Sequence, residues 1–160
     1  MLDLLSFPDE SRVWIYTSSR EFSEMEIPEI QHHVQAFARE WASHSVQLFA
    51  TAGIFHNRFL VLVVDESKMG ASGCSIDSSV RFIKELGDKY NADFFNRQLY
   101  SFLMSDEVCV YDHAELKSAF KNGEIGHHTL FFDTLVKSKG EFQRAWLKPV
   151  GSSWLQRLLN

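Results

Sequence analysis

The chain has 160 residues, of which 45% are hydrophobic and 23% charged, and this composition is typical of one globular domain and excludes a disordered or fibrous protein. Sixteen Lys and Arg against 21 Asp and Glu give a formal net charge of −5. Because no basic stripe runs along the sequence either, we expect no nucleic-acid partner.

A strand and an amphipathic helix are the first predicted elements. Arg12–Thr17 is β-branched and aromatic, which favours a strand. Residues 26–43 carry apolar side chains at spacings of three and four, which predicts a helix with one buried face. Pro28 fits the first turn of that helix, where an N–H group would have no partner in any case.

Two hairpins flank a second helix over residues 75–90. The predicted strand pairs are 46–55 with 58–65, across His56 and Asn57, and 98–104 with 107–111, across Ser105 and Asp106. The run Phe59-Leu-Val-Leu-Val-Val64 is apolar on both faces, so we place it at the centre of the sheet.

The last third of the chain is less regular. Asp112 and Glu115 have the spacing of a capping box, which predicts a short helix that Gly123 closes. Residues 129–132 are expected to form a strand. Residues 153–159 favour a terminal helical turn.

These elements predict an α+β fold in a single domain, residues 1–160. We expect a mixed, mostly antiparallel sheet with helices packed mainly on one face. The segment 133–160 is expected to wrap the sheet, and a second copy or another protein would cover the apolar surface that it leaves.

The strongest local signal is a Gly/Ser-rich turn that joins the central strand to the second helix. A helix start has unpaired N–H groups and partial positive charge, and glycine lets the backbone approach a guest. These properties suit a small anion such as a phosphate or a carboxylate. The candidate ligand-binding residues are Asp65, Gly73, Cys74, Ser75, Asp77, Ser78 and Ser79.

Three alternatives stay open for this turn. It can be an ordinary helix start, capped by Ser75 or Asp77. Cys74 can be the nucleophile of a thiol-dependent enzyme, because a helix N-terminus lowers the pKa of a thiol. Asp65 and Glu66 can hold a metal ion such as Mg²⁺. A P-loop is excluded because neither Gly70 nor Gly73 is followed by Lys.

Several stretches resemble one protein family. They are residues 10–16, 57–67, 72–83 and 135–137, with Trp154, and together they span nearly the whole chain. Their sequence is similar to a family of small uncharacterised bacterial proteins, sometimes labelled ABC transporter ATPase although they lack Walker and signature motifs. The resemblance implies no activity or catalytic residue, and it is densest over residues 72–79.

We therefore expect a cytoplasmic, non-catalytic binding or interaction domain without a cofactor. Two cysteines, Cys74 and Cys109, do not make a disulfide framework, and residues 1–8 have no basic start typical of a signal peptide. The longest apolar run, six residues, is far below the roughly 20 that span a membrane. The expected partners are a small anionic ligand and another protein chain or a second copy.

Overall fold

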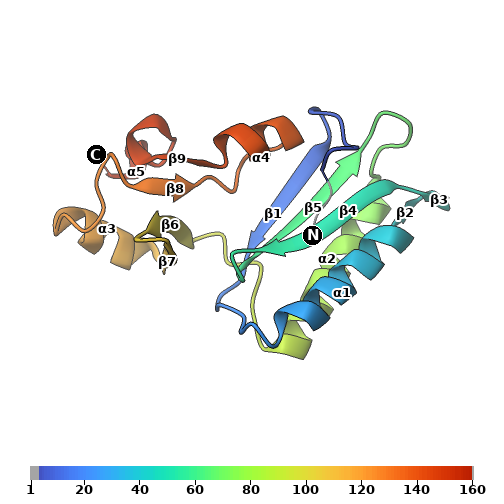
Figure 1. The fold of residues 1–160 in the computed structure, drawn as a ribbon, viewed down its shortest axis with the longest axis horizontal. Helices are drawn as coiled ribbons and strands as arrows, with labels where there is room; N and C mark the ends of the chain where they lie inside the picture. Colours follow the sequence, from blue (N-terminus) through green and yellow to red (C-terminus); the bar gives the residue numbers. More distant parts are fainter. Residues whose placement is uncertain (1–3, 160) are drawn as a thin grey trace.

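The computed structural model of the chain describes residues 4–159, and it confirms the α+β fold class (Figure 1). Residues 1–3 and 160 of the predicted domain lie outside the described residues. The elements in chain order are β1 (Arg12–Thr17), α1 (Ile27–Glu40), β2 (Ala42–Ser43), β3 (Val46–Gln47), β4 (Phe49–Phe55), β5 (Phe59–Asp65), α2 (Gly73–Tyr90), β6 (Tyr100–Met104), β7 (Glu107–Tyr111), α3 (His113–Lys121), β8 (Leu130–Phe132), α4 (Lys139–Ala145), β9 (Leu147–Pro149), the 3₁₀ helix η1 (Val150–Ser152) and α5 (Gln156–Leu159).

The strands form separate sheets, where the sequence predicted one mixed sheet. The N-terminal sheet has the order β1-β5-β4, the C-terminal sheet has the order β7-β6-β8-β9, and β2 pairs with β3 alone. Every strand pairing among residues 4–159 is antiparallel. The helical connection from β1 does not create a parallel pair because β5 lies between β1 and β4 and pairs with both.

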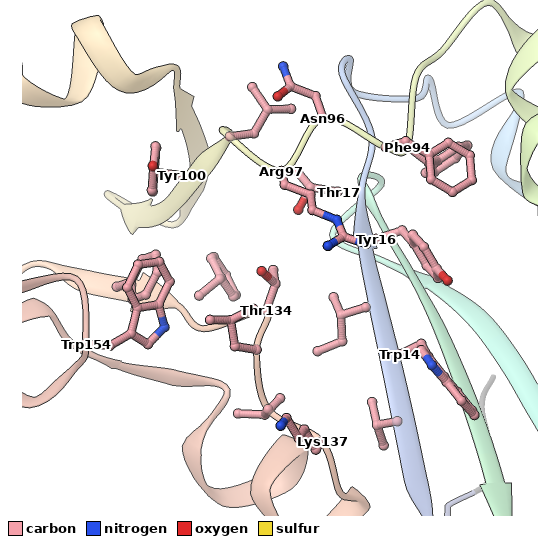
Figure 2. Close-up of a pocket in the computed structure, with 18 of the residues that line it drawn as sticks. Trp14, Tyr16, Thr17, Phe94, Asn96, Arg97, Tyr100, Thr134, Lys137 and Trp154 are labelled. Carbon is pink, nitrogen blue, oxygen red and sulfur yellow. The ribbon is translucent and has the colours of Figure 1, made fainter. Parts of the chain in front are cut away.

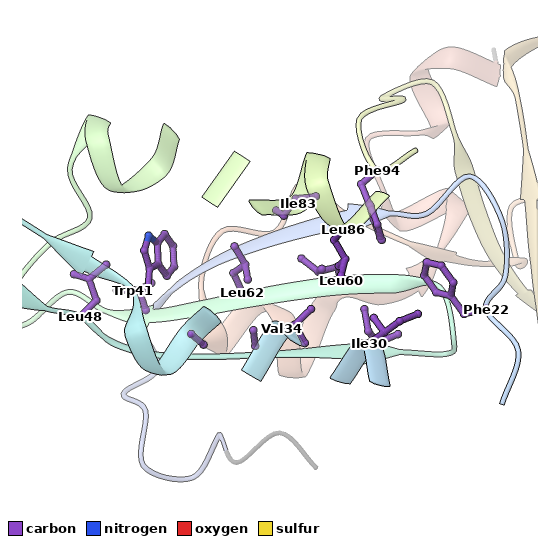
Figure 3. Packing of buried hydrophobic residues seen from close by; sticks show 14 residues of the cluster. Phe22, Ile30, Val34, Trp41, Leu48, Leu60, Leu62, Ile83, Leu86 and Phe94 are labelled. Carbon is purple, nitrogen blue, oxygen red and sulfur yellow. The ribbon is translucent and has the colours of Figure 1, made fainter. Parts of the chain in front are cut away.

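The central position predicted for β5 is confirmed. Each residue from Phe59 to Val64 is 0% exposed, because both faces of the strand are covered. Leu60, Leu62 and Val64 belong to a first hydrophobic cluster with α1 and α2 on one face of the N-terminal sheet. Figure 3 shows side chains of both helices meeting those of β5 in this cluster.

The opposite face of the N-terminal sheet is covered by the C-terminal part of the chain. Val61 and Val63 pack in a second cluster with Phe132, Phe142 and Trp146. A third cluster lies within the C-terminal sheet and includes Phe102, Phe131 and Leu155. Because successive side chains of a strand point to opposite faces, Phe131 and Phe132 serve different clusters.

Turn chemistry explains the hairpins. His56 and Asn57 have φ of 51° and 54°, and Ser105 and Asp106 have φ of 52° and 64°. Two consecutive positive φ angles define the two-residue turn whose twist matches that of paired strands. The predicted hairpins across these dipeptides are therefore confirmed.

Several predicted boundaries are corrected. The first helix ends at Glu40, because the chain becomes extended at Trp41 and residues 42–43 enter the short β2–β3 pair. Residues 46–55 are divided between β3 and β4, and the strand predicted over residues 98–104 begins at Tyr100. The capping box of Asp112 and Glu115 is present as predicted, and Gly123 follows the helix end with φ of 78°.

Candidate functional site

The Gly/Ser turn is a well-capped helix start. Helix α2 begins at Gly73, and its cap is Ser72, whose side chain accepts a hydrogen bond of 3.1 Å from the Ser75 N–H group. The expectation of a cap at Ser75 or Asp77 is thus wrong, because the helix starts earlier than the sequence pattern indicated. The indole N–H of Trp41 donates to the Ser75 carbonyl at 2.8 Å and ties this turn to the end of α1.

The serine hydroxyls predicted as ligand donors are engaged inside the helix. Those of Ser75, Ser78 and Ser79 donate to the carbonyls of Ser72, Ser75 and Ile76, respectively, at 2.6–2.9 Å. Ser75 and Ser79 are also only 2% and 3% exposed. Gly73, Cys74 and Asp77 are exposed. The anion site predicted here stays a prediction, with fewer free donors than its residue types indicated.

The two carboxylates before the turn have partners within their own loop. Asp65 accepts a 2.9 Å hydrogen bond from the Ser67 N–H group, and hydrogen bonds from Ser67 lower its pKa. Glu66 accepts from the Ala71 N–H group at 2.8 Å and lies 3.9 Å from the Arg12 guanidinium. Glu66 thus lies close to the start of α2. Both carboxylates accept hydrogen bonds from the backbone of the loop and so stabilise its conformation.

Neither enzymatic alternative finds the partner residues that it needs among residues 4–159: further metal ligands for Asp65 and Glu66, or a base for Cys74. Among residues 4–159 no cluster of three or more His, Cys, Asp or Glu side chains is placed to hold a metal ion. Within the same residues no interaction joins a histidine to Cys74, whose side chain is exposed. Both enzymatic roles stay untested predictions.

A cavity lies between the N-terminal sheet and the C-terminal part of the chain, and residues 65–79 do not line it. It has a volume of about 660 Å³, within the range of ligand-binding clefts. We call it the β1 cleft. Figure 2 shows it bounded by β1, by the 94–100 connection and by the 131–137 segment. Its lining consists of residues 12–17, Val80, residues 94–97, Leu99, Tyr100, Phe131, Phe132, residues 134–137 and Trp154.

One wall of the β1 cleft is the free edge of a strand. β1 is an outer strand of its sheet, and β5 occupies only one of its edges. On the other edge the Val13 N–H group donates to the Lys137 carbonyl at 2.9 Å, and the Lys139 N–H group donates to the Ser11 carbonyl at 2.8 Å. Within the described chain, backbone pairing on this edge stops at Val13 and resumes at Ser19, whose N–H group donates to the Asp93 carbonyl.

The backbone groups between those two points face the cleft. In an antiparallel ladder alternate residues direct their N–H and C=O groups to opposite edges. Val13 uses its N–H group on the outer edge, so Ile15 and Thr17, in the same phase, also point away from β5. Ile15 is half-buried and Thr17 is 8% exposed, which places these polar groups in a partly desolvated groove.

The side chains of the β1 cleft combine aromatic surface with positive charge. The ring of Tyr16 meets that of Phe95 edge to face at 5.7 Å, and Trp154 meets Phe131 at 5.5 Å. Burial raises the pKa of Tyr16. Phe95 is 39% exposed and Leu135 is 60% exposed, so each offers apolar surface to a guest.

All charged residues that line the cleft are cations: Arg12, Arg97 and Lys137. Arg12 lies over the Trp14 ring, 4.5 Å from its centroid, and near Glu66. In the described chain neither Arg97 nor Lys137 forms an ion pair within 4.0 Å. A chain with a net charge of −5 thus lines this cleft with three basic side chains and no acidic one. The carboxylates of Asp93 and Glu141 lie just behind the lining, where they accept hydrogen bonds from the Phe95 and Lys137 N–H groups.

Comparisons of the chain with protein-family models, with curated proteins and with solved structures gave no match. The family resemblance of the sequence therefore stays a prediction. Within residues 4–159 no helix combines the length and apolarity needed to cross a membrane.

None of the residues predicted as ligands lines the β1 cleft. Local sequence does not reveal this cleft, because two of its walls, β1 and residues 134–137, are more than 100 residues apart in the chain. Two local signals were available. Phe94 and Phe95 are adjacent aromatics in a connection, and the second of them stays exposed. Arg97 and Lys137 both lie in connections between predicted elements.

Proposed function

We propose that the protein is a non-catalytic binding domain whose ligand site is the β1 cleft. The ligand carries negative charge and an apolar part. The observation that supports this proposal most strongly is the combination, in one cleft, of exposed apolar side chains with the unpaired cations Arg97 and Lys137. Both charges are exposed, so each attracts an anion only modestly, and the apolar surface beside them supplies the rest of the contact.

A binding role agrees with the chemistry around the cleft. The carboxylate of Asp133, behind one wall, is buried and accepts hydrogen bonds from the Lys148 ammonium at 2.8 Å and the Trp154 indole N–H at 2.9 Å. The hydrogen bond to Asp133 holds Trp154 in the wall of the cleft. Thr134 is held there as well, because it directly follows Asp133 in the chain. Asp133 therefore supports the shape of the site.

The fluorescent dye 1-anilinonaphthalene-8-sulfonate tests this proposal, because it is an apolar aromatic anion. We expect saturable binding at one site and about fivefold weaker affinity in the double variant Arg97→Gln/Lys137→Gln, since both charges are exposed. The matched control is Arg81→Gln/Lys84→Gln, which removes the same charges from the exposed face of α2 and should bind as the unmodified protein does. Equal affinity of both double variants would contradict the proposal.

A further inference from the structure

We propose that the guest of the β1 cleft is an acidic peptide segment in extended conformation, added as a new strand along the outer edge of β1. This inference rests on the proposed function and specifies its ligand class. The backbone of β1 supplies hydrogen bonds, and the cations of the cleft select the charge of the guest.

The chain itself shows that this edge accepts a strand. Ser138 forms an antiparallel bridge with Arg12, flanked by the two backbone hydrogen bonds of Val13 and Lys139. Past Lys137 toward Thr134 the segment leaves the edge and becomes the opposite wall of the cleft, as Figure 2 shows. The edge of β1 therefore continues as an unpaired ladder beyond the point where its own partner ends.

The unpaired length suits a short segment. From Trp14 to Thr17, beyond the last paired residue, the strand extends about 10 Å at roughly 3.4 Å per residue, which matches a guest of about four residues. Ile15 is a half-buried residue and Thr17 a buried one, and a backbone group that is shielded from water without a partner is unfavourable. A guest strand would satisfy the outward backbone groups of these residues, as in other cases of strand addition to a sheet edge.

The side chains of the cleft determine the composition of the guest. Successive residues of a strand point to opposite faces, so a guest with alternating apolar and acidic residues presents one apolar and one charged face. Phe95 and Leu135 offer apolar contacts, whereas Arg97 and Lys137 offer charge-assisted hydrogen bonds to carboxylates. A basic guest would be repelled by the like charges of Arg97 and Lys137.

The test is an NMR titration of the full chain with a blocked octapeptide that alternates valine and glutamate. We expect the Ile15 and Thr17 amide signals to shift and their hydrogen exchange to slow, because these N–H groups gain acceptors. The same peptide with lysine in place of glutamate should not bind. Arg97→Gln/Lys137→Gln should weaken binding by about fivefold, and Arg81→Gln/Lys84→Gln should not.

Methylated peptides isolate the backbone contribution. One peptide carries N-methyl groups on its valines and another on its glutamates, so that each lacks the N–H donors of one edge. At least one of them should bind about fivefold or more weakly than the parent peptide, because strand addition needs those donors. Unchanged affinity of both peptides would overturn the inference, as would unprotected amides at Ile15 and Thr17.

Two further results would show that a different ligand occupies the β1 cleft. If the sulfonate dye binds in the cleft and the glutamate peptide does not, the proposed function stands and strand addition is wrong. If Ile15 and Thr17 are already protected without peptide and the solution mass is doubled, the occupant is a second copy of the chain, which also overturns the inference.

Discussion

At the scale of single residues, a hydroxyl or a carboxylate decides where a helix begins and how it is held. Ser72 caps α2 through the Ser75 N–H group, and the carboxylate of Glu26 lies at the start of α1, where it binds the Arg20 guanidinium at 2.7 and 3.1 Å. Arg20 in turn donates twice to the Tyr90 carbonyl at the end of α2. These contacts join the beginning of one helix to the end of the other.

Replacing the cap of α2 should cost stability without changing the β1 cleft. We expect Ser72→Ala to lower the free energy of unfolding by about 1 kcal/mol, since the Ser75 N–H group loses its acceptor. Urea denaturation followed by circular dichroism measures this change. Ser78→Ala serves as the control because its hydroxyl bonds only within the helix. A Ser72 variant as stable as the Ser78 variant would contradict the assignment of the cap.

The Arg20–Glu26 pair should make stability depend on pH. The hydrogen bond from Arg20 lowers the pKa of Glu26 from 4.5 to about 2. A carboxyl group whose pKa is lowered by folding stabilises the protein above its unfolded pKa, and this stabilisation is lost as pH falls toward the folded value. The free energy of unfolding should therefore decrease as the pH falls from about 5 to about 2.

The measurement is the slope of the unfolding free energy against pH over that window. Glu26→Gln should flatten the slope, because the group that titrates differently in the two states is gone. Glu24→Gln is the matched control, since Glu24 is exposed and precedes the same helix without an ion pair among the described residues. An unchanged slope in the Glu26 variant would show that the pair does not couple to folding.

At the scale of elements, hydrophobic periodicity predicts the strands and helices whose buried residues repeat regularly along the sequence. β5 is apolar throughout and buried on both faces, and α1 buries Ile30, Val34 and Ala38 at spacings of four. The hairpin turns were predictable because their polar dipeptides adopt positive φ. Such elements follow from local sequence, because each burial pattern repeats within a few residues.

The division into sheets and the β1 cleft depend on contacts that local sequence does not encode. Whether β8 pairs with β6 or with the N-terminal sheet is decided by packing, in which Phe131 and Phe132 face different clusters. The partial pairing of residues 137–139 with β1 joins segments far apart in the chain. The Gly/Ser turn, in contrast, was correctly located as a helix start, but its hydroxyls are used internally.

Substitutions of two leucines, Leu62 in the central strand and Leu135 in the cleft, should have different effects on the free energy of unfolding. Leu62→Ala should lower the free energy of unfolding by about 2–5 kcal/mol, because its side chain is 0% exposed in the first cluster. Leu135→Ala should change it by less than about 0.5 kcal/mol, because Leu135 is 60% exposed. Calorimetry or urea denaturation measures both changes. Comparable losses in the two variants would mean that Leu135 is part of the folded core.

At the scale of the whole molecule, the two main sheets are held together by the second cluster and leave the β1 cleft beside it. Phe132, Thr134, Leu135 and Val136 all line the cleft, and Phe132 and Val136 also pack into that cluster. The wall of the cleft is thus anchored by buried neighbours on either side. In a chain that is acidic as a whole, Arg97 and Lys137 give this cleft two cations without an ion pair among the described residues, which attract an anion.

The most direct test of this account is a map of backbone amide shifts across the chain during titration with the sulfonate dye. The β1 cleft as the ligand site predicts that the largest shifts fall on residues 12–17, 94–99 and 134–137. Shifts concentrated on residues 72–79 would instead place the anion at the Gly/Ser turn of α2 and contradict the account, and so would the absence of saturable shifts.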